Sequence, residues 1–143
     1  MNKYILGLFA LVLLVGCSAK GPEPINYGSD ECVHCKMTIM DNKFGAVILN
    51  KNGKSFKFDS AECMIDYSNE NPEHSDSYFV TDLNKPTSFI NAKEAVFLHG
   101  DNIKSPMGGN IAAFSTKPDA TKVQQELQGD LLNWEEVKAL RKK

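Results

Sequence analysis

The sulfur-bearing side chains near residue 35 are the best suited to chemistry in this sequence. The segment Asp30–Met40 holds two thiols, one imidazole and two thioethers. Because the two residues inside a Cys-x-x-Cys turn fold back as a tight knuckle, Cys32 and Cys35 can direct both sulfur atoms at one metal ion. Met37, two residues after Cys35, can add a neutral sulfur donor. The spacing therefore predicts a sulfur-rich metal site.

Two sulfur atoms elsewhere in the chain can complete this site. Asp59 is expected to cap a helix, with Glu62 three residues later as its capping-box partner, and this places Cys63 in the first helical turn. The helix dipole and the unpaired N–H groups of that turn favour a thiolate at Cys63. Met107 lies at the apex of the loop 105–109, whose two glycines permit close backbone approach. We expect Cys63 and Met107 as further ligands, although a loop methionine folded over a core edge also fits Met107.

The remaining soft side chains have simpler explanations. A gap-filling role in an apolar core explains Met37 as well as a ligand role does, and it is the better explanation for Met40 and Met64. We expect none of the three histidines to be a main ligand: His34, His74 and His99.

Three kinds of chemistry remain open for the Cys-x-x-Cys pair. A soft transition metal is one, and a structural zinc site completed by Cys63 and a histidine is another. The third is a redox disulfide, in which case the protein would be a thiol-disulfide oxidoreductase. Thiolate and thioether donors together suit Cu(I), whereas zinc sites rarely use methionine. Because Cu(I) accepts two or three soft ligands, such a site can stay open and pass its ion to a partner.

The first sixteen residues have the composition of a signal rather than of a folded element. Tyr4–Gly16 is uncharged but too short to cross a membrane as a helix, and Leu14–Cys17 resembles a lipobox. We therefore predict a signal peptide over residues 1–16, a diacylglycerol on the Cys17 sulfur and an acylated amine. Residues 17–29 are expected to form a lipidated flexible tether. Two or three acyl chains hold a protein stably at a membrane surface.

Length and charge limit the function classes that fit. The chain has 143 residues and a formal net charge of −2, so it carries no basic field that would favour nucleic acid. One compact domain is expected over residues 30–143, with halves at about 30–74 and 75–143. With Cys17 used for the lipid, three cysteines remain, and an odd number argues against a purely structural disulfide framework. No hydrolytic triad or phosphate loop stands out, which leaves hydrolytic and phosphoryl-transfer chemistry without support.

Hydrophobic patterns and turn signals predict an α+β fold of two small ββα-type halves. A hairpin is expected from 44–49 and 55–58, followed by the helix that starts at Asp59 and ends before Asn71. Pro118 is expected to open a later helix that ends before Gly129, and Asn133 with Glu136 to cap a terminal helix. The other expected strands are 78–80, 95–98, 111–114 and 130–132.

In their order and spacing these motifs resemble the NosL family, copper-binding lipoproteins that are accessory proteins of nitrous oxide reductase. The resemblance runs from about Cys32 to Val137. It rests on the lipobox, on Cys32-x-x-Cys35-x-Met37, on Phe58-Asp59 followed by Cys63-Met64, and on Met107-Gly108-Gly109 leading through Ala113-Phe114 to Asp119-Ala120.

The resemblance implies two ββα-type halves, similar to the treble-clef arrangement of an organomercurial lyase, and a metallochaperone rather than an enzyme. It implies that the protein binds Cu(I) outside the cytoplasm and delivers it to nitrous oxide reductase, an enzyme of denitrification, or to another extracytoplasmic copper protein. The copper ligands it implies are Cys32, Cys35, Met37 and Met107, with Cys63 as a further candidate.

Two positions depart from the pattern expected of the family. Lys36 stands where a glycine is expected between the knuckle cysteine and Met37, and Gln128 stands in place of the first glycine of a pair. Neither change replaces a sulfur donor. Ser18 is not the aspartate associated with inner-membrane retention, which favours the outer membrane where the cell has one. A homodimer or a complex with accessory proteins is left open.

Overall fold

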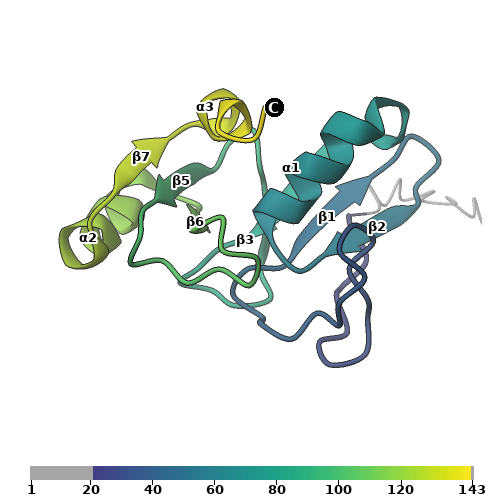
Figure 1. Cartoon of the computed structure of the whole chain (residues 1–143), viewed down its shortest axis with the longest axis horizontal. Helices are drawn as coiled ribbons and strands as arrows, with labels where there is room; N and C mark the ends of the chain where they lie inside the picture. Colours follow the sequence, from purple (N-terminus) through teal and green to yellow (C-terminus); the bar gives the residue numbers. More distant parts are fainter. Residues whose placement is uncertain (1–20, 143) are drawn as a thin grey trace, which may run out of the picture.

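The chain folds into two small antiparallel sheets with helices packed on them, which confirms the predicted α+β class (Figure 1). The computed structural model describes residues 21–142, so the predicted signal peptide and Cys17 lie outside the described residues. No helix within residues 21–142 is long and apolar enough to cross a membrane.

The first sheet has four antiparallel strands in the order β2-β1-β3-β4. In β2 the side chains alternate, so that Phe56 and Phe58 are buried while Ser55 and Lys57 are half-buried. The helix α1 (Ala61–Glu70) packs on β1 and β2, and it buries Met64 and Ile65 completely. A short 3-10 turn, Pro72–His74, follows it. The four strands are β1 (Ala46–Leu49), β2 (Ser55–Phe58), β3 (Ser77–Thr81) and β4 (Phe89–Asn91).

The second sheet has three antiparallel strands in the order β6-β5-β7. The helix α2 (Lys117–Leu127) packs on all three strands, and α3 (Trp134–Ala139) packs on β5. The predicted capping box of Asn133 and Glu136 is confirmed at the start of α3. The three strands are β5 (Val96–His99), β6 (Ile111–Phe114) and β7 (Asp130–Leu132).

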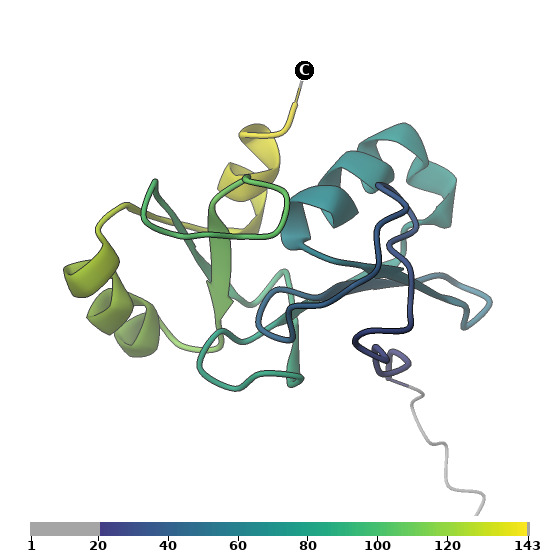
Figure 2. The same cartoon turned by 60° about the horizontal axis from the view of Figure 1, so that its bottom comes forward.

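The boundary between the two sheets differs from the predicted division at residues 74 and 75. Strand β3 pairs with β1, and β4 pairs with β3, so the first sheet extends to Asn91. The sheets are joined where β3 lies beside β6, through a parallel bridge between Asp82 and Ala113. Figure 2 shows the green and yellow half with α2 and α3 beside the teal half with α1. At the other end, Ile25 packs in the core, so the packed chain begins within the segment predicted as a tether.

The start of α1 also differs from its prediction. Ser60 is the N-cap, and its side-chain oxygen accepts from the Cys63 amide at 3.3 Å, whereas Asp59 was expected in that role. The prediction that Cys63 lies in the first turn is confirmed. The one-residue shift frees the carboxylates of Asp59 and Glu62 from capping, and both contribute to the region described next.

Candidate metal-binding site

The Cys-x-x-Cys segment forms the expected tight knuckle. The Cys32 amide donates to the Met37 carbonyl at 2.8 Å, and the Lys36 amide donates to the Cys32 carbonyl at 3.0 Å. Lys36 reaches this turn with a φ of 65°, in the left-handed region. The Val33 amide donates to the Lys57 carbonyl at 2.9 Å, which attaches the knuckle to β2.

Three cysteines and one carboxylate meet where the knuckle faces the start of α1. The sulfur atoms of Cys32, Cys35 and Cys63 and a carboxylate oxygen of Asp59 all lie within 4.8 Å of one another. Cys32, Cys63 and Asp59 are buried, whereas Cys35 is half-buried, so the cluster is accessible from the side of Cys35. All three cysteines are free thiols. The Cys35 thiol donates to the Asp59 carboxylate at 3.4 Å.

Mutual hydrogen bonding distributes charge unevenly among these thiols. A hydrogen bond from the Cys63 thiol lowers the pKa of Cys32 to about 6, with further support from backbone N–H groups. The same hydrogen bond raises the pKa of Cys63 strongly, so the expectation of a thiolate at Cys63 is wrong: the neighbouring Cys32 takes the charge instead. Burial raises the pKa of Cys35 to about 11. Near neutral pH the cluster therefore holds one thiolate, at Cys32, and two thiols.

Three methionines of the described chain are exposed. Met37 is 58% exposed, Met40 is 70% exposed and Met107 is 42% exposed. Met37 and Met40 line a groove of about 250 Å³ together with Asp59 and with Pro106, the residue before Met107. The core prediction for Met40 is therefore wrong, while that for Met64, which is fully buried, is confirmed. Asp59 belongs both to this groove and to the cysteine cluster, so the groove of Met37 and Met40 adjoins the cluster.

The sequence matches the NosL family model over residues 25–140. This chain belongs to the NosL family. Among solved structures, the crystal structure of the copper chaperone NosL from Shewanella denitrificans is similar, with 27% sequence identity and a TM-score of 0.70. The match covers 82% of this chain and 95% of that one. No curated protein matches the sequence.

Both departures from the expected NosL pattern fall where the backbone is left-handed. Lys36 has a φ of 65° and Gln128 a φ of 60°, and both stand where a NosL glycine was expected. A glycine adopts such angles without the clash that a Cβ atom causes. The backbone thus keeps the turn, with a strained side-chain-bearing residue in place of glycine.

Among the described residues, the four clustered donors include no histidine side chain. The His34 Nδ1 lies 3.7 Å from the Glu70 carboxylate, and the His74 ring nitrogen hydrogen-bonds with the Tyr67 hydroxyl at 2.9 Å. His99 ends β5. The zinc alternative had assumed a histidine as its fourth donor, but the fourth donor within the cluster is Asp59.

Asp59 is the site residue that the sequence did not indicate. Its position before a helix and three residues before Glu62 is typical of an N-cap, and this explanation left no reason to consider it as a ligand. The adjacent Ser60 is an equally good cap by residue type. Two cap residues in succession were the signal that one of them could serve another purpose.

Proposed function

We propose that this protein is a copper chaperone that binds Cu(I) as cargo and transfers it to a copper enzyme outside the cytoplasm. The observation that carries the proposal is the meeting of three cysteines from two distant segments with Asp59, which also lines the groove of the exposed Met37 and Met40. Thiolates and thioethers are soft ligands, which favour Cu(I) over harder ions. The related protein from Shewanella denitrificans is described as a copper chaperone.

The proposed ligands are those predicted from the sequence: Cys32, Cys35, Cys63, Met37 and Met107. Cys32 needs no deprotonation to bind the ion, because it is already a thiolate near neutral pH. Cys35 and Cys63 must each lose a proton to bind the ion as thiolates, so metal binding releases protons. Cys35 is the least buried of the three cysteines and bonds to Asp59, which lines the groove of Met37 and Met40, so it is the cysteine best placed for ligand exchange with a partner.

Metal titration of the apoprotein tests this proposal. Under anaerobic conditions, Cu(I) is titrated against a chromogenic Cu(I) chelator, and zinc is titrated in parallel against a zinc chelator. We expect Cu(I) to be retained in preference to zinc. Cys32→Ala should abolish tight binding, and Met37→Leu and Met107→Leu should each weaken it while preserving side-chain volume. Preferential binding of zinc, with no effect of either methionine substitution, would contradict the proposal.

The cluster geometry keeps structural zinc as a second candidate function. Four donors, three of them thiolate formers and one a carboxylate, is the ligand number of a closed zinc site. A structural zinc ion contributes folding free energy, so its chelation unfolds a small domain. A chaperone site should release its ion with little loss of helical circular dichroism. Thermal unfolding before and after chelation distinguishes the two.

Thiol-disulfide exchange is less consistent with the geometry. The attacking cysteine of such an enzyme combines a lowered pKa with access to its substrate. Here the cysteine of lowered pKa is Cys32, and its exposed fraction is 0%. The more accessible Cys35 has a raised pKa. We therefore propose that the protein is not an enzyme.

We propose nitrous oxide reductase as the recipient and a lipid on Cys17 as the anchor. Incubation of the Cu(I)-loaded protein with apo-nitrous oxide reductase should restore its copper centres faster than free Cu(I) chelate does, and a Cys35→Ser variant should not. Labelling cells with a palmitate analogue should mark the wild-type protein in the membrane fraction. A Cys17→Ser variant should be unlabelled, and equal labelling of both would overturn the anchor.

A further inference from the structure

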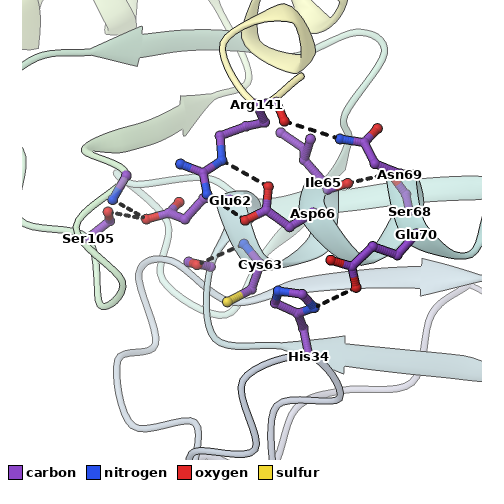
Figure 3. Close-up of polar contacts among 12 residues, drawn as sticks. His34, Glu62, Cys63, Ile65, Asp66, Ser68, Asn69, Glu70, Ser105 and Arg141 are labelled. Carbon is purple, nitrogen blue, oxygen red and sulfur yellow. Dashed lines mark hydrogen bonds and ion pairs between the residues drawn. The ribbon is translucent and has the colours of Figure 1, made fainter. Parts of the chain in front are cut away.

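The buried carboxylate of Glu62 connects the start of α1 to the loop that carries Met107. Its Oε1 accepts a hydrogen bond from the Ser105 hydroxyl and another from the Gly109 amide, the latter at 3.0 Å. Ser105 in turn accepts from the Asn110 amide at 2.9 Å. These contacts hold both ends of the loop 105–109, with Met107 between them (Figure 3 shows Glu62 and Ser105).

The loop fits against Glu62 with no room for a larger residue at its second glycine. A Cβ atom added at Gly109 would lie within 2.8 Å of three side-chain carbon atoms of Glu62. Gly108 has a φ of 68°, a conformation that glycine adopts freely. The two glycines of the Met107 loop therefore have separate roles: Gly108 turns the chain, and Gly109 lets it approach the carboxylate.

Glu62 and Cys63 are consecutive residues that serve opposite sides of the same helical turn. In Figure 3 the Glu62 carboxylate reaches toward Ser105, while the Cys63 sulfur points toward the knuckle side, where His34 lies. A single turn of α1 is thus bonded to the Met107 loop and contributes a sulfur atom to the cluster. Any displacement of this turn therefore moves the Met107 loop and the Cys63 sulfur atom together.

Glu62 is a carboxylic acid in a buried position, where it lowers the stability of the fold. Its exposed fraction is 1%, and its Oε2 has no hydrogen-bond partner among the described residues. A buried carboxyl group with an unpaired oxygen lowers stability compared with an apolar side chain of similar size. Packing alone therefore does not explain it, whereas a need for a fixed acceptor opposite the loop does.

From these contacts we propose that Glu62 is a positioning residue, which fixes the Met107 loop so that the Met107 sulfur can complete the copper site. This inference rests on the proposed copper binding and adds the residue that sets the geometry of one ligand. Glu62 acts through the loop and does not itself bind the ion. Loss of a residue that orients a metal ligand typically lowers metal affinity by about 10-fold to 100-fold.

A double-mutant cycle tests the proposal on the full folded protein. Cu(I) affinity is measured by chelator competition for the wild type, Met107→Leu, Glu62→Ala and the double variant. We expect Glu62→Ala to weaken binding about 10-fold, and Met107→Leu to weaken it in the wild type but to add little once Glu62 is absent. Glu62→Gln, which keeps an acceptor oxygen, should retain most of the affinity.

Two further variants keep the test decisive where Glu62→Ala fails to fold. Gly109→Ala leaves the Glu62 carboxylate in place but pushes the loop away from it. Ser105→Ala removes one of the hydrogen bonds to Glu62. In either background, Met107→Leu should lower the Cu(I) affinity less than it does in the wild type. Asp82→Asn is the matched control, because Asp82 is also a buried carboxylate that accepts from backbone amides, those of Asn84 and Ser115. It should lower stability and leave the Met107 effect unchanged.

The outcomes separate this inference from the proposed function. If Met107→Leu lowers the Cu(I) affinity as much in the Glu62→Ala background as in the wild type, the positioning role is overturned. The proposed copper chaperone function would stand. No loss from Met107→Leu in the wild type would overturn both the positioning role and Met107 as a ligand, while binding at the cysteines would stand. Absence of Cu(I) binding by the wild type would overturn the proposed function itself.

Discussion

At the scale of single residues, the knuckle contains a turn in which a lysine, and not a glycine, has a left-handed backbone conformation. Lys36 holds a φ of 65° because it is fixed by hydrogen bonds on both sides of the turn. For a non-glycine residue, a left-handed conformation costs about 1–2 kcal/mol. The protein therefore carries strain directly between Cys35 and Met37, two of its proposed ligands.

Replacing Lys36 with glycine should stabilise the apoprotein. We expect Lys36→Gly to raise the free energy of unfolding by about 1 kcal/mol, because it removes the Cβ clash. Urea denaturation measures the change. Lys36→Ala is the matched control, since it also removes the charge but keeps the Cβ atom, and it should give no gain. Equal stabilisation by both variants would attribute the effect to charge.

The Cys32 thiolate should be visible in an acid titration of the metal-free protein. Ultraviolet thiolate absorbance should be half lost near pH 6, since the pKa of Cys32 is lowered to about 6. Cys63→Ala should move this transition upward, because the hydrogen bond that lowers the pKa comes from Cys63. A transition at the same pH in Cys63→Ala would show that the backbone N–H groups are sufficient.

The same pKa shift has a defined effect on stability. The folded pKa of Cys32 lies below its ordinary value of 9.0, so its ionisation contributes stability that is present above that value and is lost as the pH falls through about 6. Unfolding of the wild type and of Cys32→Ala is to be compared across this range. The difference between them should shrink toward acid pH, and a constant difference would contradict the assignment.

At the scale of elements, local signals predicted most of the secondary structure. Strand β6 (Ile111–Phe114) and the helix α2 have strong local patterns, and their predicted positions agree with the structure to within a residue. Strand β4 (Phe89–Asn91) was not predicted, because three residues after a turn give little periodicity. The pairing of β3 with β1 is a long-range contact, which a local pattern cannot specify.

The candidate site could be predicted in part for the same reason. The Cys-x-x-Cys knuckle is a local motif, and its approach to Cys63 followed from placing that residue in the first turn of a helix. Two features of the site could not be predicted: the place of Asp59 in the cysteine cluster and the hydrogen bonds of Glu62 to the loop 105–109. Both depend on which residue is the N-cap of α1. Ser60 and Asp59 are both good caps, and only the folded backbone distinguishes them.

The cap of α1 should influence both stability and metal binding. Ser60→Ala removes the acceptor for the Cys63 amide and should cost about 1 kcal/mol of unfolding free energy. It should also weaken Cu(I) binding, because it loosens the turn that carries Cys63. Thr116→Ala, which removes the corresponding cap of α2, is the matched control: it should cost similar stability and leave Cu(I) affinity unchanged. An equal loss of affinity in both would indicate a general effect of stability.

At the scale of the whole molecule, the end of the chain fastens the two sheets together. Arg141 follows α3 and pairs with Asp66 of α1 through two guanidinium nitrogens, one to each carboxylate oxygen (Figure 3). Both side chains are partly exposed, so solvent weakens the pair. Asn69 of α1 adds a hydrogen bond to the Arg141 carbonyl at 3.5 Å.

Breaking this contact should have a modest effect. We expect Arg141→Ala to lower the free energy of unfolding by about 1 kcal/mol, with a coupling to Asp66→Ala in a double-mutant cycle, because bidentate geometry strengthens an otherwise exposed pair. Thermal or urea unfolding of the four proteins gives the coupling. A coupling of zero would assign the contact no role in joining the sheets.

The hydrogen bond between Glu62 and Ser105 spans 43 residues of the chain, and this separation sets the order in which the site forms. The knuckle is a local turn of a short segment, whereas a contact between distant residues closes a long loop of chain and costs more chain entropy. A chain that has been synthesised only as far as its cysteines cannot hold the Met107 loop against α1, because Ser105 and Gly109 are not yet present. The three cysteines can therefore be brought together by a shorter length of chain than the complete site, which needs the chain as far as Gly109.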